Sequence, residues 1–204
     1  MTEEQVLIKQ VQDGDHEAFA ELVKRHETNV YNLCLRMSGN PEDAMDLSQE
    51  AFLKAWRGIG FYKAESAFST WLYRLTSNVC IDFLRKQKRR PTVSLTVEEE
   101  EAAVELEVED TAPSPEEQVL HTERSQAVAD AMGLLEEDFR EVLILRVVED
   151  LSYEEIAEIM DLKVGTVKSR LARARLKLKK LLEDGNKLEI AASKQKERSV
   201  RHDL

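Results

Sequence analysis

A stretch of 28 residues near the middle of the chain is unsuited to a folded core. Residues 91–118, PTVSLTVEEEEAAVELEVEDTAPSPEEQ, contain no aromatic and no basic residue and include three of the four prolines. Segments with little bulky apolar surface and an excess of like charge stay extended, because burial cannot offset the entropy lost on ordering. The sequence therefore predicts an acidic linker at 91–118 between two domains, 1–90 and 119–183, with a flexible tail at 184–204.

Both parts that flank this linker have the pattern of helical domains. Glycine and proline are scarce, at 7 and 4 of 204 residues, and apolar residues recur three and four positions apart on either side of the linker. Turn residues stand at 13–15, 38–41 and 58–60. We expect an all-α protein with a short first helix and three longer ones, the last from about 69 to 89, and further helices near 116–133, 136–149, 152–160 and 166–183.

The net charge of −11 conceals an uneven distribution. Residues 1–90 carry no net charge, 91–123 carry −11, 124–160 carry −7 and 161–204 carry +7. Basic residues gather near 85–90 and from 163 onward. Since a charge average is informative only when the charge is evenly spread, the acidity of the whole chain does not exclude binding to nucleic acid.

Several classes of function lack their usual signature in this sequence. No apolar run approaches the roughly 18 residues that a membrane-spanning helix needs, so we expect a cytoplasmic protein. Cys34 and Cys80 lie in helical patterns without CxxC spacing, which favours buried reduced thiols. The four histidines have no metal-ligand spacing, and phosphate loops and nucleophile motifs are absent. We therefore expect no enzyme activity, no catalytic residue, no metal, no cofactor and no small-molecule substrate.

The segment 151–182, LSYEEIAEIMDLKVGTVKSRLARARLKLKKLL, has the pattern of a helix-turn-helix. Ser152 and Glu155 fit a capping box at the start of a short helix, and Thr166 is placed to cap a second helix after a tight turn. One side of this second helix is basic, as a helix in the DNA major groove requires. Candidate base and phosphate contacts are Thr166, Lys168, Ser169, Arg170, Arg173 and Arg175. A solvated basic face on an ordinary helical hairpin is the alternative.

Two features of the amino-terminal half have a structural and a functional interpretation. Asp43, Asp46 and Glu50 fall on one helical face with Gln49 beside them, and composition alone favours a solvated acidic face over a docking surface. Residues 61–90 combine a polar loop, an aromatic cluster of Phe68, Trp71 and Tyr73, and a basic run, a combination that can bind single-stranded DNA. Aromatic residues at helical spacing are more often core, so the loop 61–67 and the basic run are the better candidates for DNA contact.

Three motifs together resemble a known family. DLSQEAFLKAW, FSTWLYRLTSN followed by CIDFLRK, and LSYEEIAEIMDLKVGTVKSRLARAR are similar in order and spacing to the extracytoplasmic-function (group IV) sigma factors of the sigma-70 family. The resemblance covers nearly the whole chain apart from the linker and the tail. It implies a region 2 helical bundle at 1–90 and a region 4 domain at 119–183. It also implies a sigma factor that binds core RNA polymerase, directs initiation at promoters with particular −35 and −10 elements, and assists promoter melting.

The resemblance also implies roles for individual residues. In the family, the DLxQExF helix binds the clamp helices of the largest polymerase subunit, and region 4 meets the flap of the second. This implies polymerase contacts at Asp43, Asp46, Gln49, Glu50 and Phe52, and it reverses the preference for a solvated face. The family's loop captures an unstacked −10 base, and its helix-turn-helix reads the −35 element. The −10 candidates are therefore Phe61, Tyr62, Lys63, Ala64, Glu65, Ser66, Ala67, Asn78, Arg85 and Lys86.

The resemblance also bears on partners and on the competing function. Members of the family are commonly restrained by an anti-sigma factor, often one that is bound to the membrane, so such a partner is expected here beside core polymerase and promoter DNA. A conventional helix-turn-helix regulator that does not join polymerase is the competing function. It explains residues 151–182 but leaves the amino-terminal half without a purpose.

Overall fold

The computed structural model describes the backbone of residues 2–89 and 115–200, and the side chains of these residues except 115–123 and 186–200. The described residues form helices and connecting turns, without a β-strand, so the expected all-α class is confirmed. The amino-terminal half contains the helices α1 (Glu3–Gln12), α2 (His16–Ser38), α3 (Pro41–Gly58) and α4 (Phe68–Arg89), with a short 3₁₀ turn, η1 (Ile59–Phe61), before α4.

Local signals in the sequence fix where these helices begin and end. Asp15 caps α2 and Asn40 caps α3, each accepting hydrogen bonds from two backbone N–H groups of the first turn. Gly39 ends α2 with φ of 75°, a left-handed conformation that costs glycine little. The expected short helix followed by three longer ones is therefore confirmed.

The core of the amino-terminal half lies between α2, α3 and α4. Leu22, Leu33 and Leu72 are almost completely buried there. Cys34 on α2 and Cys80 on α4 are also fully buried, and their Sγ atoms are 3.8 Å apart without a disulfide. The neighbouring Cys34 thiol and burial together raise the pKa of Cys80 well above its usual range. The sequence-based expectation of buried reduced thiols is confirmed.

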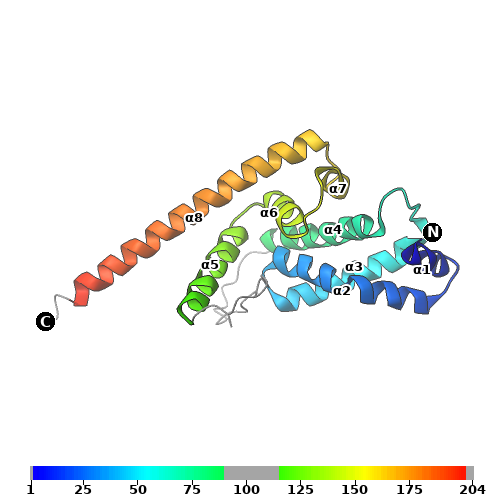
Figure 1. Ribbon diagram of the computed structural model, residues 1–204, viewed down its shortest axis with the longest axis horizontal. Helices are drawn as coiled ribbons and strands as arrows, with labels where there is room; N and C mark the ends of the chain where they lie inside the picture. The colour runs from blue at the N-terminus through cyan, green and yellow to red at the C-terminus, as the bar shows by residue number, and fades with distance from the viewer. Residues whose placement is uncertain (1, 90–114, 201–204) are drawn as a thin grey trace.

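The carboxy-terminal half contains α5 (Pro115–Gly133), α6 (Glu137–Leu143), the π-helical turn η2 (Ile144–Val148), α7 (Tyr153–Ile159) and α8 (Val164–Val200). The expected capping box at Ser152 is confirmed, because Ser152 accepts from the backbone of Glu155 and the Glu155 side chain accepts in return. Figure 1 shows α6 and α7 lying against the amino-terminal helices, with α8 extending away from them.

Three sequence-based expectations differ from this half of the structure. Helix α8 begins at Val164, so Thr166 lies inside its first turn and is not its cap. The helix expected to end near 183 continues to Val200, because the residues after Asp184-Gly185 are good helix formers. The helix expected at 136–149 passes into the π-helical η2 after Leu143. Most of the expected linker, residues 91–114, lies outside the described residues, and α5 already begins at Pro115.

Within the described residues, we find no helix that is both long enough and apolar enough to cross a membrane.

Candidate functional site

Three separate surfaces carry the residues that the sequence selects. The first is the outer face of α3. Ala44, Leu47, Ala51 and Ala55 are buried against the rest of the bundle, and this leaves the opposite side of the helix in water. Asp46, Gln49 and Glu50 are exposed on that side, and Asp43 is half-buried beside them. Glu50 forms an ion pair of 3.1 Å with Lys54, so part of the acidic face is already neutralised.

An exposed leucine shares this acidic face. Leu53 is 54% exposed and lies seven residues after Asp46 and three after Glu50, which places all three on one side of the helix. Phe52 lies elsewhere: it is half-buried and packs on the core. Burial, and then the charges of Asp46 and Glu42, raise the pKa of Asp43. Sequence reasoning missed Leu53, although its spacing of seven from Asp46 was a usable signal.

The second surface is the loop between η1 and α4. Tyr62 is half-buried, with its ring 5.3 Å from that of Trp71 and 5.7 Å from that of Phe68, and its hydroxyl donates to the Ser66 carbonyl at 2.6 Å. Gln12 of α1 donates to the carbonyls of Ile59 and Tyr62, both at 2.9 Å. The loop is thus fixed from both sides by packing and hydrogen bonds.

The last residue of η1, at the start of this loop, presents an aromatic ring to solvent. Phe61 is 85% exposed, whereas Phe68 is buried and Trp71 is half-buried. Lys63, Ala64, Glu65 and Ala67 are exposed as well, and Ser66 is half-buried. Ala64 has φ of 56°, an uncommon conformation for a residue with a Cβ, and such positions tend to occur where function requires a particular loop shape.

Helix α4 extends this surface toward its basic end. Asn78, Arg85 and Lys86 are exposed, and the spacings of seven and eight residues place them on one side of the helix. Lys88 points elsewhere, since its ammonium group is 2.6 Å from the Glu137 carboxylate. The expectation that Phe68 and Trp71 belong mainly to the core agrees with their burial, and Arg85 and Lys86 of the basic run are exposed.

The third surface is the helix-turn-helix formed by α7, the turn at 160–163 and α8. Val167, Leu171 and Ala174 are buried under α8. The outer face carries the exposed residues Lys168, Ser169, Arg173 and Arg175, with Thr166 half-buried at its edge. Arg173 also donates through Nε to the Ser169 carbonyl at 3.3 Å, which orients its guanidinium along the helix.

Arg170 differs from the other residues of this set. Its side chain is only 20% exposed, and its guanidinium forms an ion pair of 3.0 Å with Asp138 of α6. The sequence predicted that Arg170 lies on the basic side of this helix, opposite its apolar stripe. The structure instead directs it toward the neighbouring helix, where it holds α8 against α6.

Tyr153, which sequence reasoning missed, supports the start of the basic face. The Lys168 ammonium lies 5.3 Å from the centre of the Tyr153 ring, and the Arg146 guanidinium lies 5.5 Å from it. Such cation–π contacts orient long side chains that would otherwise sample many rotamers. The available signal in the sequence was the position of this aromatic residue, directly after the Ser152 cap.

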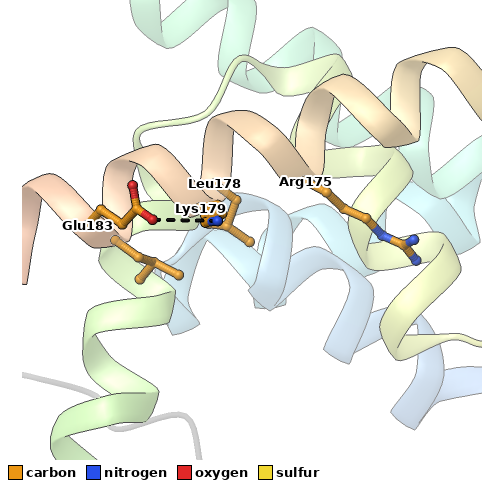
Figure 2. Close-up of a pocket in the computed structure, with 5 residues that line it drawn as sticks. Arg175, Leu178, Lys179 and Glu183 are labelled. Atoms are coloured by element: carbon orange, nitrogen blue, oxygen red, sulfur yellow. Dashed lines mark ion pairs between the residues drawn. The ribbon is translucent and has the colours of Figure 1, made fainter.

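A shallow open groove runs along the outer part of α8. It has a volume of 390 Å³ and is lined by Arg175, Leu178, Lys179, Leu182 and Glu183. In Figure 2 a dashed line joins Lys179 and Glu183, which form an ion pair of 3.7 Å. Its lining contains no nucleophile or metal-ligand cluster, so the groove does not resemble a catalytic pocket.

Two family models match this chain, one in each half. The family model of sigma-70 region 2 matches residues 22–90, and that of sigma-70 region 4 matches residues 125–178. The chain is 38% identical to the ECF RNA polymerase sigma factor SigW of Bacillus subtilis (strain 168), over 87% of this chain and 95% of the relative. It is 42% identical to the ECF RNA polymerase sigma-E factor of Escherichia coli (strain K12), over 84% of this chain and 90% of that protein.

Solved structures agree with these relatives. CnrH in complex with the cytosolic domain of CnrY is similar with a TM-score of 0.63 and 26% identity, covering 89% of this chain and 97% of that one. The sigma factor RpoE in complex with the anti-sigma factor NepR from Bartonella quintana is similar with a TM-score of 0.61 and 27% identity, covering 81% and 96%. From its two sigma-70 regions and from these relatives, we conclude that the chain belongs to the extracytoplasmic-function RNA polymerase sigma factors of the sigma-70 family.

Proposed function

We propose that this sigma factor divides its work among the three surfaces described above. The acidic face of α3, with Asp43, Asp46, Gln49 and Glu50, binds the clamp helices of core polymerase. The loop 61–67 and the adjoining side of α4 capture the −10 element, and the basic face of α8 reads the −35 element. In this assignment the domains are 1–90 and 119–183, joined by the acidic segment at 91–118.

The observation that carries the proposal is the free basic face of α8. Lys168, Ser169 and Arg173 are exposed together over a buried apolar stripe, while Arg170 is held against α6. Arginine and lysine can donate to guanine O6 and N7 in the major groove, and their charge attracts phosphates. We therefore assign base or phosphate contact to Lys168, Ser169 and Arg173, phosphate contact to Thr166 and Arg175, and a positioning role to Arg170.

The direct test is run-off transcription with purified core polymerase on a pool of genomic promoters, with and without this protein. We expect new, discrete start sites that share spaced −35 and −10 elements. Absence of new starts and of polymerase binding, from folded protein, would favour the conventional DNA-binding regulator instead. We expect turnover of nucleic acid in neither case, because the proposed role needs no catalytic step, metal or cofactor.

Arg173→Ala is expected to weaken binding to the −35 element by roughly 1–3 kcal/mol if its contact is bidentate, and to relax selectivity at one base pair. The measurement is holoenzyme affinity for a set of promoter fragments that vary at each −35 position. Lys179→Ala is the matched control, since Lys179 is an exposed cation of the same helix, six residues farther on. Equal effects of the two substitutions would mean that Arg173 contributes only charge.

Phe61→Ala is expected to reduce open-complex formation by roughly 1–3 kcal/mol, the range for one aromatic side chain stacked on an unpaired base. The ring is 85% exposed, so its loss should leave the fold unchanged. Permanganate reactivity of unpaired thymines would report melting directly. Two results would contradict the contact with Phe61. One is normal melting of a duplex promoter by the Phe61→Ala variant, and the other is equal binding of the variant and the unsubstituted protein to a pre-melted template.

We also propose that an anti-sigma factor restrains the chain. RpoE of Bartonella quintana was solved with the anti-sigma factor NepR, and the similarity to it covers 81% of the present chain. Because core polymerase and its promoters are cytoplasmic, the proposed function places the chain in the cytoplasm, where a membrane-bound anti-sigma factor could hold it at the membrane.

A further inference from the structure

We propose that Gln12, the last residue of α1, is a positioning residue for promoter melting, because its side chain holds the turn that presents Phe61. This role rests on the proposed function, in which Phe61 stacks on an unpaired base of the −10 element. It brings α1 into that function. The match to the sigma-70 region 2 model begins at residue 22 and leaves α1 outside it.

The contact uses both hydrogens of one amide group. Nε2 of Gln12 lies 2.9 Å from the carbonyl oxygen of Ile59 and 2.9 Å from the carbonyl oxygen of Tyr62. A side-chain NH₂ group has two donors, and each of them has a backbone acceptor here. One acceptor precedes Phe61 in the chain and the other follows it. A single side chain, 47 and 50 positions away from its two partners, therefore spans the whole turn.

The turn needs support from outside. Its first residue, Ile59, is buried, and the Tyr62 ring that follows the turn packs on Trp71, but Phe61 between them is 85% exposed. Gly60 lies beside Phe61, and a Cβ built on it would meet no atom within 4 Å. Glycine has wide freedom in φ and ψ, and nothing nearby confines this one. Side-chain packing thus anchors the two ends of the turn, whereas Gln12 fixes the orientation of its peptide groups.

The helix that supplies Gln12 is itself held firmly. Val11, directly before Gln12, is only 5% exposed, and α1 packs along α2. Two side-chain contacts between α1 and α2 add to this packing, from Glu3 to Arg25 at 2.9 Å and from Glu4 to His26 at 2.8 Å. A donor on a fixed helix restrains its acceptors, whereas a donor on a mobile loop would move with them. The geometry therefore makes α1 a brace for η1.

A brace of this kind acts on the fraction of molecules that are ready to bind. If the turn samples several shapes, only some of them place the Phe61 ring where it can stack on a base. The apparent affinity for the unpaired base is then reduced by the fraction in the competent shape. One or two partly exposed hydrogen bonds correspond to a factor of roughly three to ten in such an equilibrium. We therefore expect loss of the Gln12 amide to reduce open-complex formation roughly threefold to tenfold.

The test begins with Gln12→Met, which keeps the length of the side chain and removes both donors. Gln10→Met is the matched control, since Gln10 is an exposed residue of the same helix and lies about 200° around its axis from Gln12. Holoenzyme that contains each variant is assayed for open complexes on a duplex promoter by permanganate reactivity. Gln12→Met should show the reduction, and Gln10→Met should match the unsubstituted protein. Affinity for core polymerase should be the same for both, because the acidic face of α3 is untouched.

A double-mutant cycle with Phe61→Ala separates positioning from a general loss of stability. If Gln12 acts through Phe61, Gln12→Met should reduce melting in the unsubstituted protein and have no further effect in the Phe61→Ala background. If Gln12 only stabilises the fold, its effect should be equal in both backgrounds. An equal effect, or a loss of melting with Gln10→Met as large as that with Gln12→Met, would overturn the proposal.

Amide hydrogen exchange of the free full-length chain tests the same contact without polymerase or DNA. The Tyr62 N–H donates to the Ile59 carbonyl at 3.1 Å and closes η1, so its exchange rate reports opening of the turn. This rate should rise roughly threefold to tenfold in Gln12→Met and stay unchanged in Gln10→Met. An unchanged rate in folded Gln12→Met would overturn the proposal. If Phe61→Ala leaves melting normal, the proposed function of the loop fails, and the exchange of Tyr62 alone decides whether Gln12 holds the turn.

Discussion

Replacing Asp46 and Glu50 together with lysine is expected to weaken binding to core polymerase by at least about 100-fold, because like charges brought together at an interface cost several kcal/mol. Both side chains are exposed on the outer face of α3, and neither supports the core. The helix should therefore fold normally, with its apolar side still packed on α2. The measurement is the affinity of fluorescently labelled core polymerase, at two salt concentrations, because a charge-driven contact weakens with salt.

The matched control reverses two other exposed acidic residues of the same half. Asp13→Lys with Glu27→Lys changes the net charge by the same amount but lies outside the acidic face of α3. If both double variants lose binding equally, general charge and not a specific surface drives the association. If neither does, α3 is not the docking helix. A separate variant, Leu53→Ala, measures the apolar part of the same face, where the side chain is 54% exposed.

Glu141→Gln is expected to stabilise the protein by up to about 3 kcal/mol at pH 8. Burial raises the pKa of Glu141 from 4.5 to about 7, and the nearby charge of Asp138 adds to this, while Arg170 and Arg85 act in the opposite direction. The pKa of the folded state is higher than that of the unfolded state, so folding takes up a proton between about pH 4.5 and pH 7. Stability is therefore fully present below about pH 4.5 and is lost as the pH rises toward 7.

Glutamine cannot ionise, so it avoids this loss. The gain should fall below about 1 kcal/mol at pH 5, where the folded carboxyl is already protonated. Urea unfolding at pH 5 and pH 8 provides the comparison. Glu137→Gln is the control and should lower stability at pH 8, because Lys88 lowers the pKa of Glu137 and the charged carboxylate stabilises the fold. A Glu141 variant whose stability advantage does not depend on pH would contradict the assignment.

Local signals explain which parts of the fold were predictable. The caps at Asp15, Asn40 and Ser152 act within three residues of themselves, so the sequence alone locates the starts of α2, α3 and α7. The buried stripe of Val167, Leu171 and Ala174 likewise follows from helical spacing. The resemblance to the family implied roles in docking and promoter recognition for these elements. Composition alone had favoured a solvated acidic face on α3.

The remaining features depend on contacts between distant residues. Arg170 leaves the basic face only because Asp138 lies 32 positions earlier on α6. Glu149 reaches Arg36 and Tyr73 across more than 75 residues, and no periodicity within one helix reports such a pairing. Helix α8 begins two residues before Thr166, and the Thr166 N–H donates to the Lys163 carbonyl as part of its first turn. Tertiary structure therefore decided the details of the site, whereas local chemistry decided its elements.

The buried cysteine pair makes this chain convenient for spectroscopic labelling. Cys34 and Cys80 are both fully buried, and the pKa of Cys80 is raised, so little thiolate is present to react with a maleimide. They are also the only two cysteines in the sequence. A cysteine introduced at an exposed position would therefore react with a maleimide in preference to the native thiols. Dyes or spin labels could be attached there without first replacing Cys34 and Cys80.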